Sequence, residues 1–168
     1  MKNPEHILST ETRVALPLED VFSFFSAAEN LERITPPELR FRIVTPTPVK
    51  IRQGTLIDYR LSLFGISFPW RTEITVWKPP FEFVDTQIRG PYAQWIHRHT
   101  FRQENGETII TDEVRYRLPI PFLGELGMPL VRLQLKRIFG HRERSIRGLL
   151  AGGGGRAVGG WKQSGVGR

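Results

Sequence analysis

Two histidines and an aspartate occupy what the sequence predicts to be the buried face of a β-hairpin. Residues 92–117 form two runs of alternating polar and apolar side chains, separated by an Asn-Gly dipeptide at positions 105 and 106. Asn-Gly between alternating runs indicates a two-residue hairpin turn, because a type I′ turn needs positive φ at both central residues. With this turn, His99 faces Asp112 on the neighbouring strand, and His97 lies on the same face.

The rest of that face is apolar. It carries Trp95, Phe101, Ile110, Val114 and Tyr116. A polar group inside an apolar layer needs a hydrogen-bond partner or access to water. The sequence therefore leaves two interpretations open: a structural His99–Asp112 hydrogen bond within a packed core, or a polar patch on the wall of a ligand cavity.

Three kinds of chemistry are compatible with these polar residues. As a polar wall, they would hold a carbonyl or hydroxyl group of a ligand whose apolar part is buried by aromatic side chains. As a catalytic group, Asp112 would orient His99 and raise its basicity, with His97 beside them, which suits a dehydration or a cyclisation. As a metal site, the two histidines and Asp112 are ligands that zinc accepts. Such neighbours on one strand face often arise by chance, so we expect no metal and no cofactor.

The periodicity of the chain predicts the elements that position these residues. We expect a strand over 6–16 and then a helix that starts at Pro17. Glu19 and Asp20 lie in its first turn, where the positive end of the helix dipole stabilises acidic side chains. The other expected elements are a short helix over 28–34, strands over 39–44, 55–64, 68–77 and 81–88, the central hairpin, and a long helix over 129–150. In the 68–77 strand, alternation places Trp70 on the inward face and Trp77 on the outward face.

This order indicates an α+β fold with one cavity. A bent antiparallel sheet has a concave face, and a long amphipathic helix lying across it leaves space between the two layers. Arg142 falls on the apolar side of the long helix, where a charge needs a partner. We expect one domain over residues 1–150 and a disordered Gly-rich tail over 151–168.

Composition limits the class of protein. The chain has 168 residues, no cysteine and a net charge of +7, and much of its basic charge lies in the long helix. Without cysteine there is no disulfide and no thiolate metal site, and no apolar run is long enough to span a membrane. We expect a cytoplasmic protein, monomeric or homodimeric. Nucleic acid is not an expected partner, because the basic residues lie on one helix without an exposed aromatic platform.

Three local patterns resemble a known superfamily. They are Phe83-x-Asp85-x-Gln87-x-x-Gly90-Pro91-Tyr92-x-x-Trp95-x-His97-x-His99-x-Phe101, Thr111-Asp112-Glu113-Val114-x-Tyr116-x-Leu118-Pro119 and Ile138-Phe139-x-x-Arg142. Together with the element order, they resemble the START/polyketide-cyclase (SRPBCC, birch-pollen-allergen-like) superfamily, in a bacterial ligand-binding, cyclase/dehydrase-like branch. The resemblance implies a helix-grip fold: a curved antiparallel sheet of about six or seven strands wrapped on a long C-terminal helix, with two short helices after the first strand.

The resemblance also implies a hydrophobic ligand between the sheet and the long helix, but it carries over no catalytic set. We expect a lipid, quinone or polyketide-like ligand. The alternatives are a cyclase or dehydratase that uses a His99–Asp112 pair, with His97, and a lipid carrier whose basic C-terminal helix makes a weak contact with an anionic membrane. The predicted ligand-binding residues are Trp70, Phe83, Gln87, Trp95, His97, His99, Phe101, Asp112, Tyr116, Leu135, Phe139 and Arg142.

Overall fold

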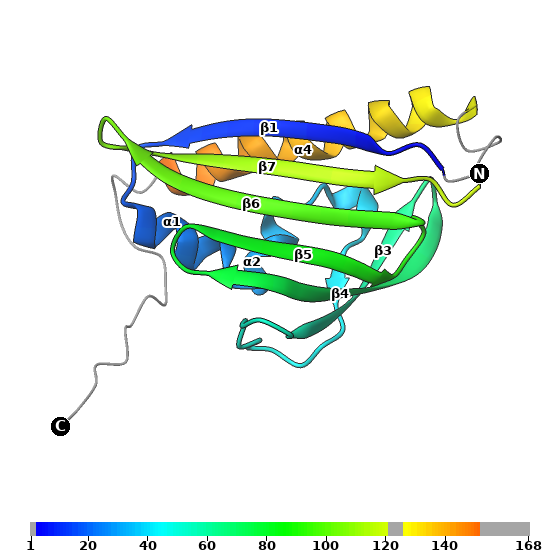
Figure 1. Cartoon of the computed structure of the whole chain (residues 1–168), viewed down its shortest axis with the longest axis horizontal. Helices are drawn as coiled ribbons and strands as arrows, with labels where there is room; N and C mark the ends of the chain where they lie inside the picture. Colours follow the sequence, from blue (N-terminus) through cyan, green and yellow to red (C-terminus); the bar gives the residue numbers. More distant parts are fainter. Residues whose placement is uncertain (1–2, 121–125, 152–168) are drawn as a thin grey trace.

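The structure, a computed structural model, describes residues 3–120 and 126–151 and contains one seven-stranded antiparallel sheet (Figure 1). The strand order is β1-β7-β6-β5-β4-β3-β2. The elements are β1 (His6–Val14), α1 (Leu18–Phe25), α2 (Glu29–Ile34), the 3-10 turn η1 (Pro37–Leu39), β2 (Arg42–Ile43), β3 (Leu56–Leu63), β4 (Ile66–Lys78), β5 (Glu82–Arg89), β6 (Gln94–Glu104), β7 (Glu107–Arg117) and α4 (Met128–Ala151). The tail predicted to be disordered lies outside the described residues, apart from Ala151.

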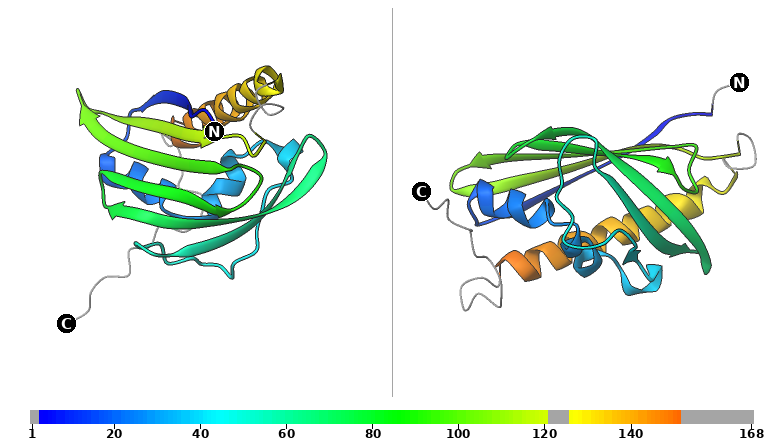
Figure 2. Two further views of the ribbon diagram at one scale, coloured as in Figure 1. Left: turned by 45° about the vertical axis from the view of Figure 1, so that its right-hand side comes forward. Right: turned by 90° about the horizontal axis from the view of Figure 1, so that it is seen from below.

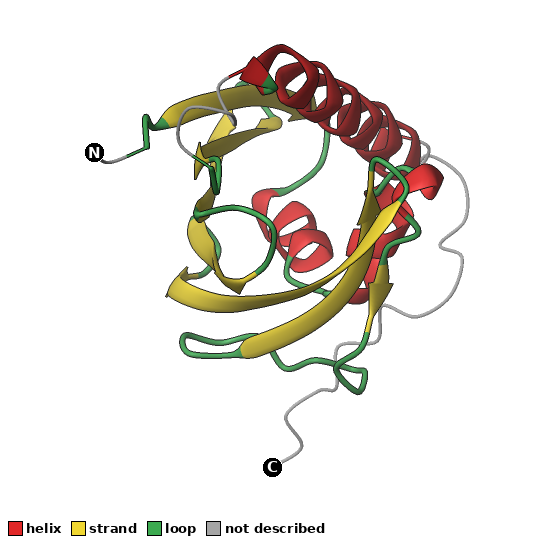
Figure 3. Ribbon diagram, turned by 90° about the vertical axis from the view of Figure 1, so that its right-hand side faces the viewer, coloured by secondary structure: helices red, strands yellow, loops and turns green. Residues whose placement is uncertain are grey.

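The predicted helix-grip fold is confirmed. The sheet curves, and the long helix α4 lies across its concave side (Figure 2). In Figure 3 the strands run round two sides of the molecule, α4 covers a third side, and the short helices lie between the strands and α4. All paired strands are antiparallel, and short turns join the successive strands from β3 to β7.

The central hairpin has the register that its turn predicts. Trp95 pairs with Tyr116 and His99 pairs with Asp112 across β6 and β7. Asn105 and Gly106 have φ values of 53° and 81°, the positive values that a type I′ turn needs. The local turn sequence was therefore enough to place the two central polar residues opposite each other.

The outward position expected for Trp77 is wrong. The pairing of β4 with β5 shifts between Ile74 and Val76, which inverts the alternation of β4 beyond that point. Trp77 consequently packs inside, with its ring centroid 5.2 Å from that of Phe22 and 5.9 Å from that of Phe83. It therefore belongs to the packing of α1 on the sheet and offers no outward surface for a dimer.

The first strand after the short helices is shorter than expected. Pro37 starts the 3-10 turn η1, so Leu39 is part of that turn, and β2 covers only Arg42 and Ile43. Proline fixes φ near the value of a helical first turn, which competes with an extended conformation here. This short strand pairs with β3 and forms one edge of the sheet.

Within residues 3–120 and 126–151, no helix combines the length and the apolar character needed to cross a lipid bilayer.

Glu5 ties the start of the chain to the ends of β6 and β7. Its carboxylate accepts hydrogen bonds from Gln94 at 2.8 Å, from Arg115 at 2.6 Å and from Arg117 at 3.2 Å. The bond from Gln94, followed by those from the two arginines, lowers the pKa of Glu5 to about 2. A carboxyl group whose pKa is lowered by folding stabilises the folded state above its unfolded pKa and loses that effect as the pH falls.

We predict that Glu5→Gln lowers the urea midpoint of unfolding at pH 7, because the amide cannot replace the ionised acceptor. The difference from the wild type should be complete above about pH 4.5 and should vanish as the pH approaches about 2. Urea unfolding followed by circular dichroism across this range checks it. Glu104→Gln, at the exposed hairpin turn, is the control and should change little. A difference between wild type and Glu5→Gln that persists unchanged at pH 2 would contradict the prediction.

Candidate functional site

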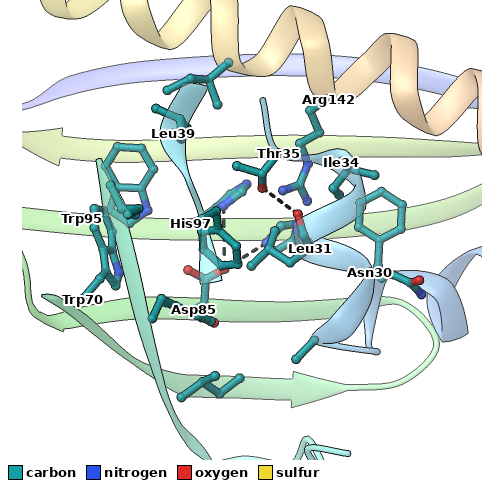
Figure 4. A pocket seen from close by; sticks show the side chains of 18 of the residues that line it. Asn30, Leu31, Ile34, Thr35, Leu39, Trp70, Asp85, Trp95, His97 and Arg142 are labelled. Atoms are coloured by element: carbon teal, nitrogen blue, oxygen red, sulfur yellow. Dashed lines mark hydrogen bonds and ion pairs between the residues drawn. The ribbon is translucent and has the colours of Figure 1, made fainter. Parts of the chain in front are cut away.

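A cavity of about 170 Å³ lies between the concave face of the sheet and the helices α2 and α4 (Figure 4). Its wall is mostly apolar. Leu31 and Ile34 come from α2, Tyr59 from β3, Trp70 from β4, and Leu135 and Phe139 from α4. The polar residues of the wall include Asp85, His97, His99 and Arg142. An apolar enclosure with a few convergent polar groups is the usual form of a small-molecule site.

Strand alternation brings the polar residues of the sheet to this wall. Residues two apart on a strand share a face, so Asp85 follows Phe83 on β5, and His97 and His99 follow each other on β6. The pairing of β5 with β6 places Asp85 opposite His97. This contact depends on the turn around Gly90, whose geometry the sequence does not reveal.

Asp112 is the buried centre of the polar cluster. Its side chain is 3% exposed, and its Oδ1 lies 2.9 Å from Nε2 of His97 in a hydrogen bond. The same oxygen lies 2.8 Å from Nδ1 of His99, although that contact lacks hydrogen-bond geometry. Arg142, from α4, places a guanidinium nitrogen 3.6 Å from it. Asp112 does not line the cavity but lies behind the residues that do.

Asp85 faces the same two histidines from the cavity side. Its Oδ2 lies 2.9 Å from Nε2 of His99 and 3.7 Å from Nδ1 of His97. Each imidazole therefore has one nitrogen toward Asp112 and the other toward Asp85. Figure 4 shows Asp85 and His97 from the sheet and Arg142 from α4 pointing toward the same region.

The pKa values of the cluster shift in directions that keep both carboxylates ionised. Burial raises the pKa of Asp112, but Arg142 and the two histidines outweigh it and hold that pKa well below its usual value. Burial likewise raises the pKa of Asp85, but His97 and His99 overcome this effect, so the pKa is lowered. For His99, burial lowers the pKa, but Asp112 and Asp85 raise it above its usual value. Burial and the neighbouring charge of His99 lower the pKa of His97.

The partner that Arg142 requires is therefore Asp112. Arg142 is buried, and its guanidinium carbon lies 5.3 Å from the centre of the Phe25 ring. A cation over an aromatic face is stabilised by the ring quadrupole, in addition to the attraction of the carboxylate. The apolar side of α4 thus carries a charge because the sheet presents the opposite charge to it.

Eight of the twelve predicted ligand-binding residues line the cavity. They are Trp70, Phe83, Trp95, His97, His99, Leu135, Phe139 and Arg142. Whether they contact a ligand stays a prediction. The acid–base role of the His99–Asp112 pair also stays a prediction. The structure adds Asp85 to it, since Nε2 of His99 contacts that carboxylate at the cavity wall.

The other four predicted residues lie outside the cavity wall. Asp112, the first of them, lies behind the wall. Phe101 packs between Phe22 and Phe25, and the hydroxyl of Tyr116 contacts the sulfur of Met128 at 3.7 Å. The side-chain amide of Gln87 donates to the backbone carbonyl of Tyr92 at 2.7 Å and so supports the β5–β6 turn. Alternation assigns a residue to a face of the sheet, but it does not say how far along a curved strand the cavity extends.

Several wall residues were not predicted from the sequence. Asp85 was recognised in a motif, but its partner across the turn could not be assigned. Asn30, Leu31, Ile34 and Thr35 reach the cavity from α2 and the residue after it. The short helix has too few residues for its periodicity to show which side faces the sheet.

Comparison with known proteins agrees with the fold. The family model for polyketide cyclase/dehydrase and lipid transport proteins matches residues 14–145. The chain belongs to this family. The match includes every residue of the polar cluster and all of the cavity wall, and it confirms the superfamily that the three sequence patterns resemble. Among curated proteins, no sequence match was found.

Solved structures share the fold at low sequence identity. A START superfamily protein from Mycobacterium smegmatis has a TM-score of 0.62 at 17% identity, and the match covers 88% of this chain and 98% of that one. TTHA0849 from Thermus thermophilus has a TM-score of 0.64 at 19% identity over 90% and 100% of the two chains. Major latex-like protein 151 from Panax ginseng has a TM-score of 0.64 at 12% identity over 87% and 97%.

We predict that Arg142→Met destabilises the protein by about 3 kcal/mol, because it leaves the buried Asp112 carboxylate without its cationic partner. Chemical unfolding at pH 7 checks this value. Arg144→Met, at an exposed position of the same helix, should stay within about 0.5 kcal/mol of the wild type. In a double-mutant cycle, Asp112→Asn should be less harmful in the Arg142→Met background than alone. Strictly additive effects would show that the two side chains do not interact.

Proposed function

We propose that this protein binds a compact, mostly apolar ligand that carries at least one polar oxygen, in the cavity between the sheet and α4. The observation that carries the proposal is the composition of the wall: aromatic and aliphatic side chains on most sides, with the Asp85–His97–His99 cluster and Arg142 on one. The family description, which includes both cyclases and lipid transport, supports a ligand of this class.

The size of the cavity favours a ring system over a long chain. Sites for drug-sized ligands usually enclose about 300–1,000 Å³, whereas this cavity encloses about 170 Å³. An apolar cavity of about 150 Å³ is known to bind benzene. Among the ligands expected from the sequence, a quinone or a small polyketide-like ring therefore fits this cavity better than a lipid with a full acyl chain.

The arrangement of the wall supports an oriented ligand. The rings of Trp70 and Trp95 meet edge to face at 5.4 Å and form one apolar side. The polar cluster can donate to a ligand carbonyl or hydroxyl through a histidine or Arg142. A ring with an oxygen at one end would thus bury its apolar part against the tryptophans and satisfy its oxygen at the cluster.

We predict that 1-naphthol, a two-ring compound with one hydroxyl, binds at a single site per chain. Leu31→Trp should weaken its binding at least about tenfold, because the larger side chain fills the cavity. Isothermal titration calorimetry measures the affinities. Leu133→Trp, an exposed position on α4, is the matched control and should bind as the wild type does. Thermal unfolding confirms that both variants fold. Equal binding to wild type and Leu31→Trp would show that the probe binds elsewhere.

A second candidate function is loading of the ligand from an anionic membrane. Leu130 and Leu133, in the first turns of α4, are 56% and 66% exposed, and residues three apart lie on one side of a helix. Leu126, just before α4, is 70% exposed. The exposed cations Arg132 and Lys136 lie beside them. Exposed leucines flanked by basic residues on a helix are the pattern of a membrane-surface contact.

The tip of the β3–β4 hairpin supports the same contact. Phe64 and Ile66 are 53% and 61% exposed at this tip. Figures 1 and 2 show the tip at the same end of the molecule as the start of α4. A bilayer approached by that end would meet both groups of apolar side chains.

We predict that the protein binds vesicles containing phosphatidylserine more tightly than vesicles of phosphatidylcholine alone, and that added salt weakens this binding. Leu130→Ser/Leu133→Ser should reduce vesicle binding at least about tenfold, since it removes the apolar area that enters the interface. A vesicle co-sedimentation assay measures it. The matched control, Phe81→Ser/Leu149→Ser, removes two exposed apolar side chains from the opposite end of the molecule, at the β4–β5 turn and near the end of α4, and should leave binding unchanged. The same loss in both double variants would argue against a role for the start of α4.

A further inference from the structure

We propose that Asp85, His97 and His99 form a binding site for a divalent transition-metal ion at the polar wall of the cavity. This metal site would be separate from the binding of an apolar ligand and would form whether or not such a ligand binds. It rests on the convergence of two imidazole nitrogens and one carboxylate oxygen, on the groups that hold them from behind, and on the open cavity in front.

The three donor atoms are close to the spacing that a metal ion requires. One ligand atom from each of the three residues lies within 4.8 Å of the others. Oδ2 of Asp85 is 2.9 Å from Nε2 of His99 and 3.7 Å from Nδ1 of His97. Metal bonds of about 2.0–2.2 Å place neighbouring ligand atoms about 3.0–3.5 Å apart. Small side-chain rotations therefore suffice to bring all three atoms onto one ion.

Asp112 orients both imidazoles for this role. Its Oδ1 is hydrogen-bonded to Nε2 of His97 at 2.9 Å and lies 2.8 Å from Nδ1 of His99, so it is next to the nitrogen of each ring that points away from the cavity. The two remaining nitrogens, Nδ1 of His97 and Nε2 of His99, both point toward Asp85. A carboxylate behind a histidine is the usual support of a metal-binding imidazole, because it fixes the ring and makes the ligating nitrogen more electron-rich.

Packing holds the rings in place. The ring of His99 stacks on Phe83 with centroids 4.1 Å apart, and the ring of His97 lies 5.6 Å from that of Phe139 on α4. The sheet backbone fixes the spacing of the three residues, since Asp85 pairs with His97 across β5 and β6. Ligands on paired strands with packed side chains make a more rigid site than ligands on loops.

Charge also favours an ion at this position. A histidine must be neutral to bind a metal ion, and in that state the two carboxylates and one guanidinium of the cluster leave one net negative charge. Arg142 lies near Asp112, at 3.6 Å, which leaves Asp85 as the carboxylate next to the cavity. A divalent ion there, together with one anionic oxygen of a ligand or a hydroxide, would make the cluster neutral.

The donor set selects a class of metal. Two nitrogens and one carboxylate oxygen suit Zn²⁺, Fe²⁺ or Co²⁺, whereas Mg²⁺ and Ca²⁺ prefer oxygen ligands. The cavity lies on the open side of the three residues. Coordination positions left free by the protein would therefore face the space proposed for the ligand, where an enolic or phenolic oxygen could complete the coordination.

The test uses the purified full-length chain after treatment with a chelator, with Co²⁺ alone as the probe. We expect one Co²⁺ per chain with a visible absorption band that indicates nitrogen ligation at low coordination number, and we expect Zn²⁺ to displace it. Asp85→Asn keeps the size of the side chain but removes its charge, and it should weaken Co²⁺ binding at least about tenfold, because a neutral amide is a poor ligand for these ions. His99→Gln should do the same.

The control is His141→Gln, a histidine of α4 that does not line the cavity, and it should bind Co²⁺ as the wild type does. Circular dichroism and thermal unfolding without metal show which variants are folded. If His99→Gln does not fold, Asp85→Asn alone provides the test. Two results would overturn the proposal: equal Co²⁺ affinity in wild type and folded Asp85→Asn, or no absorption band at millimolar Co²⁺. The second result would mean that the histidines and aspartates form a closed ion-pair network.

Discussion

Asp112 is a carboxylate removed from water in the middle of an apolar layer, and a buried charge of this kind is stable only with close compensating partners. Its partners come from two elements: His97 and His99 from β6, and Arg142 from α4. The contact between Asp112 and Arg142 therefore joins the sheet to the helix that closes it. Since α4 otherwise meets the sheet mainly through non-directional apolar contacts, this charge pair is the directional element that favours one rotation and one position of the helix.

The same constraint shapes the cavity wall. Asp112 lies next to one nitrogen of each imidazole, and the other nitrogens are directed toward Asp85 and the cavity side. Aromatic residues surround this polar region, so its electrostatic interactions are screened less than they would be at the surface. Ligand binding, acid–base chemistry and metal binding would all use this same arrangement, because each needs fixed polar atoms facing an apolar space.

The helix α4 has two different surfaces. Its inward side contributes Leu135, Phe139 and Arg142 to the cavity, while Leu130 and Leu133 face outward near its start. A helix that covers a ligand cavity and also exposes apolar side chains can couple a membrane contact to entry of the ligand. The physical basis is that the same element forms the wall of the cavity and the surface that would meet the bilayer.

The sequence by itself determined the order of the elements, the hairpin register that sets His99 opposite Asp112, and the need of Arg142 for a partner. These features depend on local turn geometry, on strand alternation and on the cost of an unpaired charge, and each can be evaluated within a short stretch of chain. Tertiary structure alone decided that Asp85 joins the cluster, that Trp77 turns inward, and that Phe101 and Tyr116 lie outside the cavity wall. Those outcomes depend on a β-bulge, on the turn between β5 and β6, and on the curvature of the sheet under α4, which arise from the packing of segments distant in sequence.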